Sequence, residues 1–270
     1  MVSKVKRFWP VFILLIISLL VCIANYTPGT FLSGWDTLHP EFNFGLNFQR
    51  TLFGVFRVEQ GLGAVAGHSH MADLPRIIFL YISHFIIPLS FLRYFYIFLN
   101  LILGPIGMYF LLERFFLKQK TASFLGGLFY LLNLGTLQIF NVPFEMFTTL
   151  FASLPLIFYF ALGYLDGREY RIKNLLFLGF ISLLNSPSAY AATLWYVFFL
   201  CFFTYFFVNF LIEKKDKHSL KHFLILIFVL VLTNLFWIMP NIYFILTHGK
   251  EVAHANINRL FSDQAFLKNK

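Results

Sequence analysis

The sequence predicts an all-α protein built from membrane-spanning helices. Hydrophobic residues make up 59% of the chain, the mean hydropathy is +0.74, and charged residues make up only 12%. A soluble domain has about 25% charged residues. Long apolar runs also recur along the whole chain, separated by short polar segments. Because so little polar surface is available, we expect an integral membrane protein.

The positive charge is best interpreted as a membrane-orientation signal. The formal net charge is +9, which in a soluble protein would suggest nucleic-acid binding. Here the Lys and Arg residues occur in short clusters between apolar runs, a pattern that sets topology and contacts anionic head groups. We therefore expect membrane lipid as a partner and no nucleic acid. Cys22 and Cys201 lie inside apolar runs, so no disulfide framework is indicated.

The first apolar run, Phe8–Ala24, follows Lys4, Lys6 and Arg7. It is long enough to cross a hydrocarbon core of about 30 Å when slightly extended. Signal peptides have the same pattern, but no clear small-residue cleavage site follows, and the rest of the chain is itself apolar. An uncleaved anchor with a cytoplasmic N-terminus is therefore favoured.

Seven further apolar runs follow, which would give eight spans in total. They cover residues 77–92, 94–112, 121–140, 144–165, 175–191, 192–212 and 223–246. If every run crossed the membrane, the basic clusters at 114–120, 168–173 and 214–221 would lie on the face opposite the N-terminus. That arrangement violates the positive-inside rule.

The run 77–92 resolves this conflict if it does not cross. It is short, lies between Arg76 and Arg93, and contains a His and a Pro. These features suit an interfacial or re-entrant hairpin better than a lipid-crossing helix. All three basic clusters then join the N-terminus in the cytoplasm. We predict a bundle of about seven spans with a long extracytoplasmic loop, 25–93, that contains interfacial helices.

The chain is predicted to form a single domain, 1–270, since neither an internal repeat nor a low-complexity linker is found. A short polar tail follows the last run, and a fragment or module of a longer protein is one interpretation. Polar residues or prolines within several runs predict faces that pack on other helices or line a wet cavity. They are Asn100, Pro105, Asn133, Asn234 and Pro240.

Chemistry is expected in the segment 34–76, which concentrates Asp, Glu, His, Arg, Asn and Gly between two hydrophobic regions. A simple connecting loop is the alternative. The layout, together with Trp35-Asp36-Thr37, Pro40 and a Gly-rich stretch leading to Pro75, resembles membrane glycosyltransferases of the GT-C class. It is most similar to the N-terminal GT-C domain of the large arabinofuranosyltransferases. The resemblance covers the whole chain in layout, but its specific motif is short.

The resemblance implies a transferase in the plasma membrane that uses a polyprenyl-phosphate-linked sugar as donor. It would transfer the sugar to a cell-envelope acceptor at the outer face, where nucleotide sugars are absent. Transfer with inversion needs a carboxylate to accept the proton of the acceptor hydroxyl. Asp36 occupies the matching position and is our candidate catalytic residue.

Two further carboxylates are candidate substrate-binding residues. Glu41 could orient a partner of Asp36, bind a metal or contact sugar hydroxyls; its alternative is a solvated loop carboxylate or helix-start residue. Glu145 lies in the second outer turn, where several GT-C enzymes place an acidic residue for metal or acceptor binding. An acidic residue between two apolar runs is costly without a role. A helix N-terminal charge favoured by the dipole is the alternative.

Arginines and histidines complete the candidate set. Arg50 and Arg57, on a predicted amphipathic interfacial helix, could bind the donor phosphate or snorkel toward lipid phosphates, and Arg76 is a further candidate. His68 and His70 could contact substrate or, with Asp73, ligate a divalent metal. Their spacing forms no closed ligand set, so the cofactor stays open.

Two other classes of function remain as alternatives. A transporter or flippase for a lipid or small solute should carry paired charges deep in its spans, and the sequence offers only residues at span edges. A non-catalytic GT-C-like membrane scaffold is the second alternative.

Overall fold

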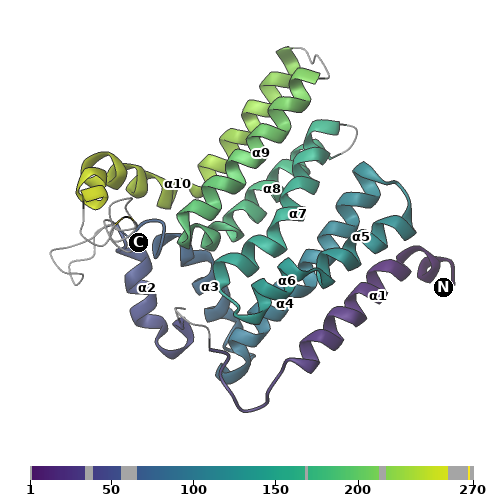
Figure 1. Cartoon of the computed structure of the whole chain (residues 1–270), viewed down its shortest axis with the longest axis horizontal. Helices are drawn as coiled ribbons and strands as arrows, with labels where there is room; N and C mark the ends of the chain where they lie inside the picture. Colours follow the sequence, from purple (N-terminus) through teal and green to yellow (C-terminus); the bar gives the residue numbers. More distant parts are fainter. Residues whose placement is uncertain are drawn as a thin grey trace.

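The computed structural model describes residues 2–33, 39–55, 66–167, 170–212, 217–254 and 267. Within these ranges all regular structure is helical and no strand occurs (Figure 1). The long helices form a bundle and shorter ones connect them. The long helices are α1 (Val2–Ala24), α4 (Leu89–Leu111), α5 (Lys120–Leu132), α7 (Glu145–Asp166), α8 (Arg171–Leu184), α9 (Ala192–Ile212) and α10 (Lys217–His254). The all-α prediction is confirmed for this part of the chain.

Four helical segments in the described ranges are long and apolar enough to cross a membrane. They are Leu89–Phe116, Glu145–Asp166, Ala192–Asn209 and Leu220–Lys250. Helices α5 and α6 (Leu134–Asn141) are bent by 41° relative to each other and make a fifth span if they count as one. Phe8–Ala24 is a shorter apolar helix. The protein therefore has the character of a membrane protein with four to five such spans.

The run 77–92 is not one helix. It is divided between α3 (Leu74–Ser83), a turn, and the start of α4. The ten residues of α3 extend about 15 Å, half of the roughly 30 Å hydrocarbon core. α3 turns back onto α4, where Leu80 packs with Leu92, Tyr96 and Ile97. The short helix and its turn are what the structure shows here, and the placement of this segment at the membrane interface stays a prediction.

The break between α5 and α6 occurs at Asn133, whose amide replaces the missing helical hydrogen bonds. Its Oδ1 accepts a hydrogen bond from the Thr136 backbone N (3.0 Å), and its Nδ2 donates to the Phe129 and Tyr130 carbonyls (3.0 Å each). Polar backbone groups cannot be left unsatisfied in lipid. Asn133 is therefore what permits a bend within an apolar segment.

Close packing between α4 and α7 depends on small residues. A Cβ added at Gly104 would overlap the ring of Phe151 on α7. The Phe151 ring in turn stacks on Tyr130 with centroids 4.5 Å apart. Small residues at helix contacts let backbones approach closely in membrane bundles. This packing brings the first turns of α4 and α7 together, and those turns carry the candidate site.

A buried polar network joins α8 to α10. Asn234, which is fully buried, donates from Nδ2 to Ser182 Oγ (2.9 Å) and accepts at Oδ1 from Trp237 Nε1 (2.9 Å). Such bonds satisfy polar groups that have no access to water. The prediction that Asn234 packs against another helix is confirmed.

The two ends of α1 show which other helix ends lie together at each end of the bundle. The C-terminal end of α1 lies beside the start of α4, with the rings of Tyr26 and Tyr94 5.1 Å apart. At its other end, Trp9 of α1 contacts Phe124 near the start of α5, at 5.2 Å. The N-terminal end of α1 lies at the same edge of the bundle as the C-terminal end of α7 and the start of α8 (Figure 1). That edge also carries basic residues: Arg114, Lys118, Lys120, Arg171 and Lys173.

Candidate functional site

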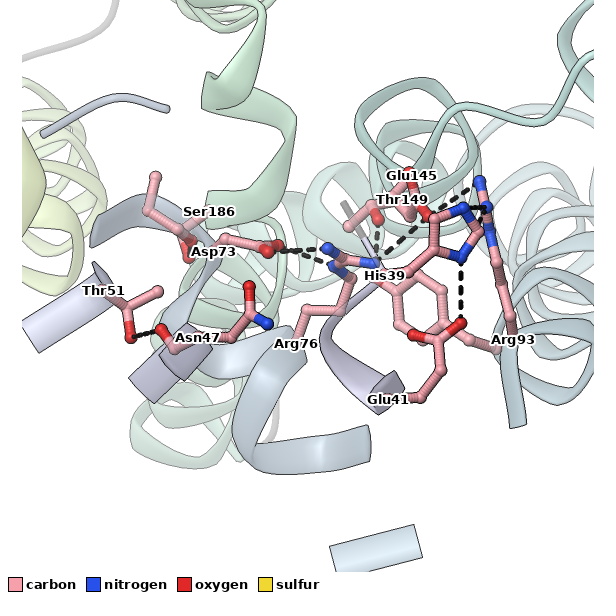
Figure 2. A network of polar contacts seen from close by, with 12 residues as sticks. His39, Glu41, Asn47, Thr51, Asp73, Arg76, Arg93, Glu145, Thr149 and Ser186 are labelled. Carbon is pink, nitrogen blue, oxygen red and sulfur yellow. Dashed lines mark hydrogen bonds and ion pairs between the residues drawn. The ribbon is translucent and has the colours of Figure 1, made fainter. Parts of the chain in front are cut away.

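Five buried charged residues gather at the opposite end of the bundle (Figure 2). We call them the charged cluster. Each is at most 6% exposed. They come from two 3-10 helices, η1 (Pro40–Phe42) and η2 (Met71–Asp73), and from α3, α4 and α7. The members are Glu41, Asp73, Arg76, Arg93 and Glu145.

Arg76 forms the strongest contacts of the cluster. Its Nε and Nη2 donate to the two carboxylate oxygens of Asp73 at 2.7 and 2.6 Å, a bidentate geometry that suits the planar guanidinium. Its Nη1 lies 3.2 Å from Glu145 Oε1. Burial alone lowers the pKa of Arg76, but the carboxylates of Asp73 and Glu145 outweigh that effect and raise it above the usual value. The side chain therefore stays charged.

Glu145 connects the two arginines. It is the first residue of α7, and its Oε1 lies 3.0 Å from Arg93 Nη2 as well as near Arg76. The N–H bonds of the arginines are not directed at this oxygen, so the contacts are ion pairs without hydrogen-bond geometry. A carboxylate at a helix N-terminus also interacts favourably with the helix dipole. The helix-start interpretation and the buried-site interpretation of Glu145 are thus compatible.

Arg93 extends the cluster toward the outer loop. Its Nη1 donates to the Leu32 carbonyl (2.9 Å) and lies 2.9 Å from His39 Nε2, while its Nη2 donates to the Pro143 carbonyl (3.2 Å). Because a guanidinium only donates, Nε2 of His39 must accept, and we assign the ring proton to Nδ1.

The remaining nitrogen of His39, Nδ1, lies 3.1 Å from Glu41 Oε1. With the proton on Nδ1, the ring donates to that carboxylate. Figure 2 shows His39 between Glu41 and Arg93, and Arg76 between Asp73 and Glu145. An unbroken series of polar contacts therefore runs from η1 to η2 through α4, α7 and α3.

A largely apolar pocket of about 100 Å³ borders the cluster, between α3, α4, α7 and α8. Arg76 lines it together with Tyr96 and Asn100. Tyr96 Oη forms a 2.6 Å hydrogen bond with Thr149 Oγ1, another lining residue. Nδ2 of Asn100 is buried and has no hydrogen bond of standard geometry in the part of the chain that the structure describes. The pocket thus combines hydrocarbon walls with a few polar atoms near the guanidinium.

The structure brings three of the sequence-predicted site residues together: Glu41, Arg76 and Glu145. The solvated-loop alternative for Glu41 is wrong, since that residue is only 5% exposed. Asp36 and Arg57 lie outside the described residues.

Arg50 lies on α2 (Phe44–Leu52), which packs beside η2 and α3. Its side chain is half-buried. Within the described residues its Nε has no hydrogen-bond partner. That nitrogen is itself buried, whereas the side chain as a whole is partly exposed.

The histidines of the loop make contacts toward α10 and η4 (Ser186–Tyr190). His68 hydrogen-bonds the side chain of Asn241, and burial lowers its pKa below the usual value while that bond opposes the shift. His70 is buried and meets the edge of the Tyr190 ring, with centroids 6.4 Å apart. In the described part of the chain no group of three or more His, Cys, Asp or Glu side chains is placed to hold a metal ion.

Sequence reasoning missed Arg93 and His39 as members of the site. Arg93 had served only to mark the end of an apolar run. An isolated charge at the edge of an apolar run usually pairs with another polar side chain or with a backbone carbonyl, and this is the signal that could have identified Arg93. His39 carries no comparable signal, because a lone loop histidine fits many roles.

No family model, curated protein or solved structure matches this chain. Its function is therefore inferred from the sequence and the site alone.

Proposed function

We propose that this protein is a membrane glycosyltransferase of the GT-C type. It would move a sugar from a polyprenyl-phosphate-linked donor to a cell-envelope acceptor at the outer face of the membrane. One observation carries the proposal: the charged cluster lies at one end of an apolar helical bundle, beside a pocket with apolar walls. A donor with a hydrocarbon tail and a charged head needs both environments at one membrane boundary.

The arrangement of the basic helix ends supports this orientation. They share one end of the bundle and the cluster lies at the other. With the basic end in the cytoplasm, as the positive-inside rule requires, the cluster faces outward. We infer seven spans, formed by α1, α4, the α5–α6 pair, α7, α8, α9 and α10, with α3 lying at the outer interface.

Asp36 is the proposed general base. It stands only three positions before His39 in the sequence, a separation that extended chain covers in about 10 Å. His39 contacts Arg93 and Glu41. The carboxylate at position 36 would take the proton of the acceptor hydroxyl as the anomeric carbon becomes cation-like.

The buried carboxylates and arginines have a different proposed role. Asp73 and Glu145 pair with the two guanidinium groups and Glu41 contacts His39. In the proposal the cluster as a whole fixes the ends of the loop that carries the base. Arg76 is engaged by its carboxylates, so Arg50, whose side chain is only half-buried on the neighbouring helix α2, is the better candidate for the donor phosphate. Arg57 remains a second candidate for that phosphate.

A non-catalytic scaffold is the second candidate function, and one observation favours it. The arginines of the cluster are engaged by carboxylates and carbonyls of the same chain, as in an internal structural contact. A transporter is less favoured, because Arg93 and Glu145 lie in the first turns of α4 and α7, near the ends of these helices.

The test is sugar transfer by the purified protein in lipid nanodiscs, with polyprenyl-phosphate sugars as donors. Asp36→Asn should lower transfer by about 100-fold or more, the usual contribution of a positioned base, with donor binding retained. The matched control is Asp166→Asn at the opposite end of the bundle, which should stay within about twofold of the parent. A normal rate in Asp36→Asn removes the base from the mechanism. Absence of transfer by the parent with every donor favours the scaffold.

A further inference from the structure

We propose that Arg93 is a positioning residue that fixes both ends of the outer-loop segment carrying Asp36. The importance of that segment rests on the proposed function; the contacts of Arg93 do not. Leu32 precedes the segment and His39 follows it, and a single nitrogen of Arg93, Nη1, contacts both. The Arg93 side chain therefore holds Leu32 and His39, seven positions apart in the sequence, close to each other.

The guanidinium is itself held in place from the opposite side. Nη2 donates to the Pro143 carbonyl at 3.2 Å and lies 3.0 Å from Glu145 Oε1. Glu145 is the first residue of α7 and Pro143 lies two residues before it, and Arg93 is only 3% exposed. Through Arg93, both loop ends are thus attached to the packed pair of helices α4 and α7. Gly104 lets Phe151 of α7 approach α4 closely. A rigid support of this kind is what a reacting group on a loop requires.

The terminal nitrogens of Arg93 are already engaged within the protein, so we assign this residue no direct contact with the substrate. Both terminal nitrogens are occupied, by Leu32, His39, Pro143 and Glu145, and Nε is buried. The planar fork of arginine gives each bond a fixed direction, which a lysine ammonium does not reproduce. Arg93 therefore acts through the loop, by setting where its ends lie.

The first test needs no enzymatic activity. Hydrogen–deuterium exchange should be followed in the peptide that covers η1, where the Phe42 and Asn43 amides bond to the His39 and Pro40 carbonyls. In Arg93→Gln we expect these amides to exchange at least about tenfold faster, while amides in the middle of α7 keep the parent rate. Local opening without loss of the core distinguishes loop positioning from general unfolding.

The second test is kinetic. Misplacement of a reacting group by about 1 Å costs on the order of 100-fold in rate, so Arg93→Gln should lower kcat by about that factor with KM for the donor within about twofold. Arg93→Lys should recover part of the loss, since its ammonium can still bond one carbonyl. Arg114→Gln at the basic end of the bundle is the matched control and should change neither exchange nor kcat.

Variants that remove Arg93 alone leave Glu145 with less neutralisation, and this could prevent folding. The double variant Arg93→Gln with Glu145→Gln removes both charges together, and we expect fast η1 exchange in it as well. Parent-like η1 exchange in either folded variant overturns the inference. If Asp36→Asn transfers normally but η1 still opens in Arg93→Gln, the proposed function fails and the positioning role of Arg93 stands.

Discussion

Replacing Glu145 by Gln tests the energetic importance of the charged cluster most directly. The carboxylate lies 3.2 Å from Arg76 and 3.0 Å from Arg93, in a site only 6% exposed. Loss of one partner from a buried ion pair costs about 3–5 kcal/mol, because the other charge stays buried. Arg76 keeps its two bonds to Asp73, whereas Arg93 keeps only neutral acceptors. We therefore expect Glu145→Gln to lower the free energy of unfolding by about 3 kcal/mol, at the lower end of this range.

The measurement is thermal unfolding in one detergent at fixed protein concentration. A loss of about 3 kcal/mol corresponds to a decrease in Tm of roughly 6–12 °C for a protein of this size class. Glu113→Gln, in the half-exposed π-helix η3 (Leu112–Phe116) at the other end, should lower Tm by no more than about 1 °C. Adding Arg93→Gln to Glu145→Gln should restore part of the loss, because the uncompensated charge is removed.

A parent-like Tm for Glu145→Gln would refute this reasoning. It would mean that Glu145 is not desolvated between the two arginines in the folded protein. Full additivity of the two substitutions would have the same meaning, since residues in contact should show a coupling energy of about 0.5–3 kcal/mol.

Three further predictions concern the loop and the buried network. Burial lowers the pKa of His68 in the folded protein, so below about pH 6.5 the unfolded chain binds more protons than the folded protein. Tm should therefore fall as the pH drops from 6.5 toward the folded-state pKa, and His68→Gln should remove that dependence. A Cβ at Gly67 would lie 2.9 Å from the Trp237 carbonyl oxygen, so Gly67→Ala should cost about 1–3 kcal/mol of unfolding free energy, measured by denaturant or thermal unfolding. Gly249→Ala is the control for crowding, because a Cβ at Gly249 would have no heavy atom within 4 Å. Asn234→Leu leaves the Trp237 N–H unpaired, with an expected loss of about 1–3 kcal/mol in the same assay.

The helical membrane class could be predicted from composition because hydropathy acts residue by residue. The break within the run 77–92 was also accessible, since that run is short and contains a Pro, and the structure divides it between α3 and the start of α4. Its placement at the membrane interface stays a prediction. The break at Asn133 was harder to place. An Asn within an apolar run indicates a partnered polar group, but only the fold shows that its own neighbours, Phe129, Tyr130 and Thr136, supply the partners.

The charged cluster could be predicted only in part. Glu41, Arg76 and Glu145 were candidates because a charge near apolar sequence is costly without a role. Their convergence depends on how α3, α4 and α7 pack, and sequence spacing carries no information about such distant pairs. The contact between Asp73 and Arg76 could have been predicted from the sequence, since residues three positions apart on a helical turn face each other. The catalytic role of Asp36 stays a prediction.

The bridge between the two arginines by the first residue of α7 has a consequence for biosynthesis. Arg93 bonds the Pro143 carbonyl fifty positions later in the chain, and Glu145 follows two residues after that. During translation, both guanidinium groups leave the ribosome before their shared carboxylate is made. The outer loop can therefore reach its final arrangement only after the ribosome has delivered α7, and a chain truncated before residue 143 would present Arg93 to the insertion machinery without its carboxylate partner, whereas Arg76 would already have Asp73.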